Sequence, residues 1–342
     1  MKNVRYRKVQ EVGRGTLTVS LPKNWAKKYG IRRGSFLSIS ERSDGCLIIE
    51  PISEKVEEIK KVSILCSGKS IKRIEWEIIG AYLLGFEVIE INAKERMEAE
   101  IRSRIKTVVQ NLIGLEILEE NSKRILINCL LDHSAVNPKR LLEREHVITM
   151  SMHKDVIHAL IEGDLNLAKS VMNRDDEVDR IYFLTVRLLR SAIQSPKLAD
   201  KFKITPIECL DYRLASSLIE SIGDYSADAA KASLKLLENK NLSNITEELK
   251  LLSNILCKMQ NSAVGAFMAR KVKLVEEVKV KLNNKLSEVL KNLDNAINIL
   301  PSDVISCFLA ILSSFEKIGK CCIDIADLVI PLEWVGEKWK KL

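Results

Sequence analysis

An acidic element occurs twice in the second half of the chain and constrains its fold more than any other feature. Glu220-Ser-Ile-Gly-Asp224-Tyr-Ser-Ala-Asp228 returns 96 residues later as Glu316-Lys-Ile-Gly-Lys320-Cys-Cys-Ile-Asp324. The preceding stretches 176–179 and 276–279 also match, 100 residues apart. Short elements that recur at a separation of 96 to 100 residues indicate a duplicated structural unit. Because the surrounding sequence is amphipathic and has few breaks, the unit is predicted to be helical.

Long amphipathic helices are predicted from about residue 138 onward. We place them at 139–162, 164–194, 206–238, 243–271, 273–300 and 303–330. Six helices in two runs of three predict two three-helix bundles, at 138–240 and 241–331, followed by a tail at 332–342. The aromatic content of only 5% fits helices that pack through aliphatic side chains.

Residues 54–137 alternate between short strands and helices, which predicts a small α/β domain. The expected strands are 62–66, 86–91, 116–120 and 124–130, and the expected helices are 71–84 and 93–112. Ser67-Gly68-Lys69-Ser70 follows a strand and opens a helix, as a phosphate-binding P-loop does. The first glycine of that motif would stand at position 63, which is serine. We therefore predict a connector, oligomerisation or sensing unit, whose helix N-terminus is able to hold an isolated anion.

The net positive charge of the chain comes from its N-terminus. The first 42 residues contain eleven Lys or Arg and two Glu, a net charge of +9, whereas the whole chain carries +8. The other 300 residues sum to −1. A compact basic module on a neutral body is typical of a nucleic-acid-binding head on a sensing or assembly body. The alternative is a module that only dimerises and keeps its charges solvated.

The same basic segment predicts a small β-rich domain. Residues 6–12, 16–21, 36–42 and 46–51 read as strands, with a short helix at 23–29. The pattern V-G-R-G-T-L-T-V-S-L-P-K-x-W-x-x-x-x-G-I-x-x-G, from Val12 to Gly34, resembles the swapped-hairpin AbrB/SpoVT/MazE family of DNA-binding domains. The resemblance implies that residues 1–53 form half of a dimeric barrel, because one copy is too small to bury a core.

This first resemblance also implies a DNA face and a homodimer. The basic residues expected on or near double-stranded DNA are Arg5, Arg7, Lys8, Arg14 and Lys23. Such side chains neutralise phosphates, and arginine also reads base edges. An antitoxin is a second interpretation for this fold family. Those chains are usually short, whereas a long folded body follows here, so we favour DNA binding.

Carboxylates recur at helical spacing in the first copy of the repeat. Asp175 and Asp179 are one turn apart on one helix, and Glu220, Asp224 and Asp228 follow at one-turn intervals on another. Facing carboxylates repel one another unless a cation lies between them, and oxygen ligands suit a hard or borderline metal ion. A metal with open positions then takes a phosphate oxygen. The alternative, a solvated acidic face, does not explain why Gly223 and Gly319 recur in register.

Two segments of the first bundle carry a second resemblance. D-D-E-V-D-R-I-Y-F at 175–183, followed by R-x-x-x-x-x-x-E-x-I-G-D at 213–224, resembles the PhoU family. PhoU proteins are duplicated three-helix bundles that bind metal clusters and regulate phosphate uptake. Over residues 139–330, the resemblance implies metal ligands and an arginine that orients a carboxylate or meets a phosphate. The implied ligands are Asp175, Asp176, Asp179, Glu220 and Asp224, and the arginine is Arg213.

The second bundle departs from this pattern. Lys279 and Lys320 stand where the first bundle has Asp179 and Asp224. A protonated lysine cannot bind a metal, so we expect Lys–Glu pairs with Glu276 and Glu316 there and no metal. The first bundle is expected to hold a metal ion or a multinuclear cluster, with iron and zinc as candidates. The four histidines, at 133, 146, 153 and 158, are expected to be packing or capping residues rather than ligands.

Together these features predict a cytoplasmic, homodimeric transcriptional regulator of phosphate uptake with a metal-binding helical body. The combination of head and body resembles archaeal phosphate-uptake regulators. Residues 1–10 contain no apolar h-region, so we expect no signal peptide. No apolar run is long enough to span a bilayer, and the scattered cysteines indicate reduced thiols. No nucleophile–base pair stands out, so we expect no enzyme; a metal-dependent phosphate-ester hydrolase is the weaker rival. A stronger rival acts by contact with a phosphate transporter ATPase or a signalling partner.

Overall fold

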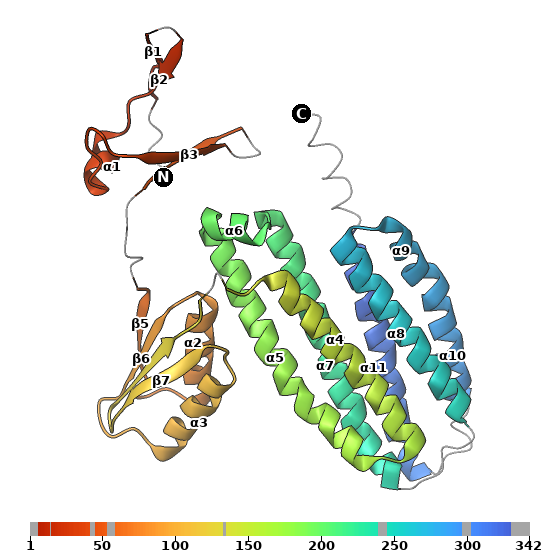
Figure 1. The fold of residues 1–342 in the computed structure, drawn as a ribbon. Helices are drawn as coiled ribbons and strands as arrows, with labels where there is room; N and C mark the ends of the chain where they lie inside the picture. Colours follow the sequence, from red (N-terminus) through yellow and green to blue (C-terminus); the bar gives the residue numbers. More distant parts are fainter. Residues whose placement is uncertain are drawn as a thin grey trace. The chain divides into compact units, whose positions relative to one another are not determined.

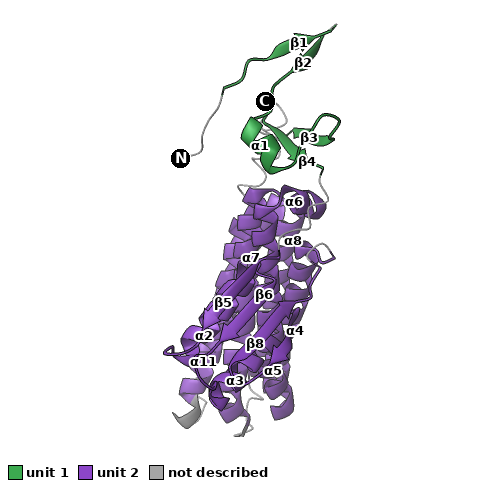
Figure 2. Ribbon diagram, turned by 90° about the vertical axis from the view of Figure 1, so that its left-hand side faces the viewer, with its two compact units in different colours: residues 1–58 green, residues 59–342 purple. Residues whose placement is uncertain are grey.

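The structure, a computed structural model, describes residues 6–13, 15–41, 45–52, 59–132, 135–238, 245–295 and 302–329. The chain divides into two compact units, residues 1–58 and residues 59–342, here called the head and the body (Figure 2). The head is a small β-rich unit, and the body is mainly helical. In the described residues no helix has both the length and the apolar character needed to cross a bilayer.

The described residues of the head form two antiparallel hairpins and one short helix. β1 (Gln10–Val12) pairs with β2 (Thr16–Thr18), and β3 (Leu37–Glu41) pairs with β4 (Leu47–Pro51). Helix α1 (Lys23–Lys28) follows Pro22, whose fixed φ suits the entry to a helix. These elements lie where the turn signals place them. The interleaved barrel that the resemblance implies involves a second chain, so it stays a prediction.

The body begins with an α/β domain. Strands β5 (Lys61–Leu65), β6 (Val88–Asn92), β7 (Leu115–Glu120) and β8 (Arg124–Cys129) form one sheet in the order β5-β6-β8-β7, and only β5 and β6 are parallel. Alternate residues of each strand face opposite sides of the sheet. One side buries isoleucines against α2 (Ile71–Leu83) and α3 (Ala99–Gln110). The other carries ion pairs, with Glu90 3.0 Å from Lys61 and 2.6 Å from Arg124.

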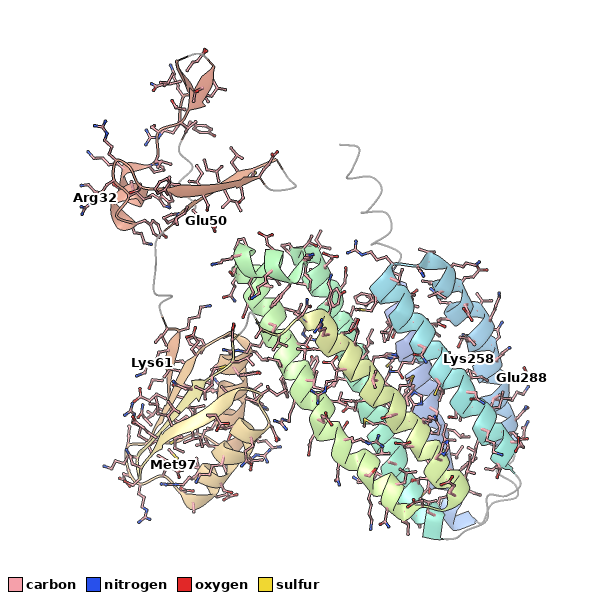
Figure 3. The ribbon with its side chains drawn as sticks, in the orientation of Figure 1. Arg32, Glu50, Lys61, Met97, Lys258 and Glu288 are labelled. Atoms are coloured by element: carbon pink, nitrogen blue, oxygen red, sulfur yellow. The ribbon has the colours of Figure 1, made fainter. Side chains whose placement is uncertain are left out.

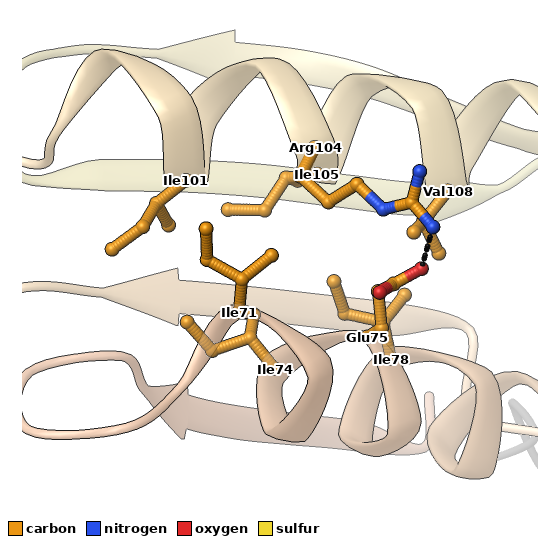
Figure 4. A pocket seen from close by; sticks show the side chains of 8 residues that line it. All are labelled: Ile71, Ile74, Glu75, Ile78, Ile101, Arg104, Ile105 and Val108. Carbon is orange, nitrogen blue, oxygen red and sulfur yellow. Dashed lines mark hydrogen bonds and ion pairs between the residues drawn. The ribbon is translucent and has the colours of Figure 1, made fainter.

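Helices α2 and α3 lie side by side and close an apolar seam between them (Figure 4). Arg104 of α3 pairs with Glu75 of α2 at 2.6 Å over the isoleucines of that seam. The predicted start of α3 at residue 93 is wrong, because the connector 93–98 pairs with the β7–β8 turn. The amide of Ala93 donates to the Lys123 carbonyl and that of Met97 to the Ser122 carbonyl, both at 2.8 Å.

The remainder of the body is a bundle of long helices (Figure 1). Its elements are α4 (Pro138–Glu162), α5 (Leu165–Gln194), α6 (Pro196–Phe202), α7 (Pro206–Glu238), α8 (Thr246–Ala269), α9 (Val272–Glu276), a π-helical segment (Glu277–Leu282), α10 (Asn283–Asn295) and α11 (Ser302–Asp327). Most bounds agree with the sequence patterns to within a few residues. The short α6 was not predicted; the Ser195 hydroxyl caps it by accepting from the amide of Leu198.

The two sets of three helices share a single hydrophobic core. Helix α7 packs on α4 and α5 of the first set and also on α11 of the second, while α4 packs on α8. The predicted uninterrupted helix at 273–300 is wrong, because a π-helical segment interrupts it at 277–282. A π turn rotates the side chains that follow it relative to a regular α-helix. The second copy of the repeat therefore differs from the first in its backbone.

Candidate functional site

Three carboxylates meet between α5 and α7. Each of Asp179, Glu220 and Asp224 offers an oxygen that lies within 4.8 Å of the oxygens of the other two. Glu220 and Asp224 are one turn apart on α7, and Asp179 faces them from α5. These helices pack closely, so the one-turn spacing seen in the sequence becomes a cluster in space. The structure thus brings together three of the five predicted ligands directly.

Asp175 extends the cluster by one turn of α5. Its Oδ1 is buried and has no hydrogen-bond partner within the described part of the chain. This oxygen lies against α7 at Gly223, where an added Cβ would be 3.5 Å from it. Buried polar atoms are nearly always paired, so this unpartnered oxygen is an available acceptor beside the other carboxylates.

Burial and mutual repulsion both raise the pKa values in this cluster. Desolvation, then the neighbouring carboxylates, raises the pKa of Asp175 to about 7 and that of Asp179 to about 6. Glu220 is likewise raised, to a pKa of about 7. The same causes raise the pKa of Asp224. A bound cation would reverse this effect, because an opposite charge favours the ionised form.

The other two predicted residues lie at the margin of the cluster. Asp176 is exposed, and it acts on Asp175 and Asp179 through its charge. The guanidinium of Arg213 stacks on the Tyr182 ring, 4.9 Å from its centroid. From there its charge opposes the rise in the pKa of Glu220. Arg213 is therefore close enough to act electrostatically on the cluster.

A buried acid on α4 was missed by the sequence reasoning. Glu145 is fully buried, and its carboxyl group hydrogen-bonds the hydroxyls of Ser216, at 2.9 and 3.0 Å, and Thr185, at 3.3 Å. Burial raises the pKa of Glu145 to about 8. The signal was present in the sequence, because Glu145 interrupts the apolar stripe of Leu141, Leu142 and Met152.

The described histidines do not join the carboxylates. His153 is fully buried and bonds Gln260 of α8 at 2.9 Å, and His146 bonds Asn261 of α8 at 3.1 Å. Burial lowers the pKa of His153 to about 4, so it packs as a neutral ring. His158 is exposed beside Glu162, and His133 lies outside the described residues.

Lysines are paired at the corresponding place in the second copy. Lys320 pairs with Glu316 at 2.7 Å, as predicted. The predicted pair of Lys279 with Glu276 is wrong, since Lys279 reaches Asp327 of α11 at 2.5 Å. The π-helical segment contains Lys279, which gives a physical reason for the different partner. In the second copy, lysines of the chain itself therefore neutralise Glu316 and Asp327.

The head presents its predicted DNA-binding residues to solvent. Arg7, Lys8 and Lys23 are exposed, and none of them forms an ion pair with another described residue. Arg5 and Arg14 lie outside the described residues. No described residue of the head is buried, although it contains large apolar side chains such as Leu17, 70% exposed, and Phe36, 80% exposed.

Comparisons with known proteins bear on both units. Residues 142–233 match the PhoU domain family. This range contains the whole acidic cluster of α5 and α7. Residues 12–57 match the family described as antidote-toxin recognition MazE, bacterial antitoxin. The resemblances to the PhoU and MazE/AbrB families are therefore confirmed for these two segments.

A curated relative and several solved structures are similar to about half of this chain. A protein of Clostridium acetobutylicum called phosphate-specific transport system accessory protein PhoU homolog is 25% identical over 190 residues, which cover 52% of this chain and 82% of that protein. The crystal structure of PhoU from Pseudomonas aeruginosa matches with a TM-score of 0.50 at 20% identity, over 56% of this chain and 93% of that one. The latter likeness establishes the helical fold alone.

Proposed function

We propose that the protein is a DNA-binding transcriptional regulator of phosphate uptake whose PhoU-like bundle senses phosphate status. The observation that carries this proposal is the position of the acidic cluster, which lies inside the segment that matches the PhoU domain. The relative named as an accessory protein of phosphate-specific transport supports the link to phosphate. Neither matching family describes an enzyme, and we assign no catalytic role.

A metal site in the first bundle is part of the proposal. Asp175, Asp179, Glu220 and Asp224 would hold a metal ion or a multinuclear cluster, with Asp176 at its edge. The buried, unpartnered Oδ1 of Asp175 fits this role, as does the oxygen-rich donor set. A metal bound there would supply a Lewis acid for a phosphate oxygen. Arg213 is within electrostatic reach of the same place and would attract the anion.

The head would bind DNA as a dimer. A unit that buries none of its described residues has no core of its own, and a second copy would cover its apolar side chains. The exposed Arg7, Lys8 and Lys23 then form part of a concentrated positive surface. Double-stranded DNA is a polyanion that would neutralise such a surface, because its phosphates would pair with these lysine and arginine side chains.

The decisive experiment incubates the purified full chain with fragmented genomic DNA of its source, with and without phosphate, and sequences the retained fragments. We expect enrichment near phosphate-transport genes that changes with phosphate. Lys8→Ala combined with Lys23→Ala should weaken retention of all fragments, and Lys61→Ala, in the α/β domain, serves as the control. Uniform retention, or none, would refute the function in transcription.

A second candidate function is regulation of a phosphate transporter ATPase or signalling partner by protein contact, with the head acting only as a dimerisation device. The name of the curated relative, an accessory protein of a transport system, favours it. The salt dependence of DNA binding separates the two candidates, because several phosphate contacts make affinity fall steeply with salt. Weak binding without such a slope would favour the protein-contact function.

A further inference from the structure

A hollow in the α/β domain lies outside the acidic cluster and is lined by basic residues. It has a volume of about 440 Å³ and follows the first two turns of α3 and the connector before it. Its lining consists of Arg96, Met97, Ala99, Arg102, Ser103 and Lys106. Met97, labelled in Figure 3, is buried and ties the connector to the β7–β8 turn. The hollow thus lies on helix α3 and on a connector that hydrogen bonds to the β7–β8 turn hold in place.

Two of the three cations are held in place from one side. Arg102 and Lys106 both pair with Glu120 of β7 at 2.9 Å, and Arg102 also donates to the Asn121 carbonyl at 3.3 Å. These bonds fix both side chains along one edge of the hollow. Groups that are already ordered lose less conformational entropy when a ligand arrives. The hollow therefore presents positive charge at defined positions.

Positive charge exceeds negative charge among the residues that line this hollow. Arg96 is exposed and forms no ion pair with any other described residue, and Glu120 is shared by the other two cations. No carboxylate is among the residues that line the hollow; the nearby Glu95, Glu98 and Glu100 are exposed. Helix α3 has no side-chain cap, so its first N–H groups add partial positive charge.

We propose that this hollow is a binding site for a small organic phosphate. Guanidinium groups bind phosphate oxygens through two parallel hydrogen bonds, and a lysine ammonium adds a point charge. The Ser103 hydroxyl offers a further donor or acceptor. The volume falls within the roughly 300–1,000 Å³ of small-molecule sites. It exceeds what a single phosphate ion needs, and Ala99 and Met97 give the organic part an apolar wall. This proposal does not rest on the proposed function.

Calorimetric titration of the full chain with AMP tests the site, with inorganic phosphate and citrate as comparison probes. We expect AMP to bind more tightly than either. Arg96→Glu should weaken AMP binding by about tenfold, because it replaces a favourable charge contact with repulsion. Arg96 forms no described contact whose loss would unfold the domain. Lys94→Glu, an equal charge change on the same connector but outside the lining, should weaken binding less than about twofold.

Each other outcome overturns the proposal. Absence of AMP binding does so, and so does AMP binding that Arg96→Glu leaves unchanged. Equal or tighter binding of citrate would assign the site to carboxylates, and equal binding of inorganic phosphate would exclude an organic ligand. If Arg96→Glu weakened only the retention of duplex DNA, the basic hollow would belong to a nucleic-acid surface. Loss of AMP binding leaves DNA retention by the head unaffected, so the two hypotheses fail separately.

Discussion

Arg187 of α5 is buried against Tyr82 at the end of α2. Its guanidinium donates hydrogen bonds to the carbonyl oxygens of Tyr82 and, at 3.1 Å, of Phe86, and it lies 4.8 Å from the centroid of the Tyr82 ring. Phe183, one turn earlier, packs into the core of the α/β domain. The helix that carries Asp175 and Asp179 is therefore also the helix that holds the α/β domain.

Removing Arg187 should destabilise this junction. Arg187→Ala removes the guanidinium donor from the Phe86 carbonyl and one of the two donors to the Tyr82 carbonyl, which the Gly85 amide still satisfies. It also opens a cavity, so we expect a loss of roughly 2–5 kcal/mol in the free energy of unfolding. Urea unfolding followed by tryptophan fluorescence measures it, since Trp76 lies in α2. Arg190→Ala, an exposed arginine of the same helix, should change the value by less than about 0.5 kcal/mol. Equal effects of the two variants would contradict a buried clamp.

Glu145 should make stability depend on pH. Its pKa is about 8 in the folded protein and near 4.5 in the unfolded chain, so the folded state binds more protons between those values. The free energy of unfolding should therefore fall as pH rises through this window. Urea unfolding at several pH values should show a shallower decline in Glu145→Gln, which stays neutral. Glu143→Gln changes an exposed neighbour and should leave the decline unchanged. If the free energy of unfolding fell equally with pH in Glu145→Gln and in the natural chain, the raised pKa of Glu145 would be refuted.

The repeated glycines should respond in opposite ways to alanine. A Cβ at Gly223 would make ordinary contacts, with its nearest neighbours Thr149 and Val178 at 3.4 Å, so Gly223→Ala should be neutral or stabilise by about 0.5–1 kcal/mol. A Cβ at Gly319 would overlap the Leu286 side chain, so Gly319→Ala should cost about 1–3 kcal/mol. Thermal or urea unfolding of the two variants makes this comparison. A larger loss at Gly223 would contradict the packing described here.

Metal content should depend on the first copy of the repeat and not on the second. Glu220→Gln removes a carboxylate from the cluster, so we expect the affinity for metal to fall about tenfold or more and the metal bound per chain to fall with it. Glu316→Gln changes the matching residue of the second copy, which already pairs with Lys320, and should leave metal content unchanged. Elemental analysis of both purified variants measures this. An equal loss from both would indicate that the second bundle also binds metal.

The head should dimerise through its exposed apolar side chains. Leu17→Asp combined with Phe36→Asp places two charges where a partner copy would bury these residues, so we expect the head to lose its dimer contact. Light scattering of the full chain gives the mass, and DNA retention should fall in parallel. Asn24→Asp, at an exposed polar position, is the control for added charge. A variant that keeps both the dimer and DNA retention would refute a shared core.

Local features of the chain could be predicted because they depend on residues close in sequence. The short strands could be predicted from turn glycines and from the alternation of isoleucines, and α1 from Pro22. Helices α4, α5, α7 and α8 could be predicted from apolar residues that recur at helical spacing over many turns. The start of α3 at residue 99 could not be predicted, because hydrogen bonds from the β7–β8 turn hold residues 93–98 out of the helix. Likewise, the π-helical segment at 277–282 has no counterpart in the repeat pattern of the sequence.

By itself the sequence determined the basic head, the duplicated helical unit and the carboxylates at one-turn spacing, since each follows from charge or periodicity along the chain. Only the tertiary structure decided which of these groups meet. It brings Asp179 to Glu220 and Asp224, buries Glu145 among hydroxyls, and directs Lys279 to Asp327 rather than Glu276. The physical reason is that helix packing and backbone irregularity set distances between residues far apart in sequence, and no local pattern encodes those distances.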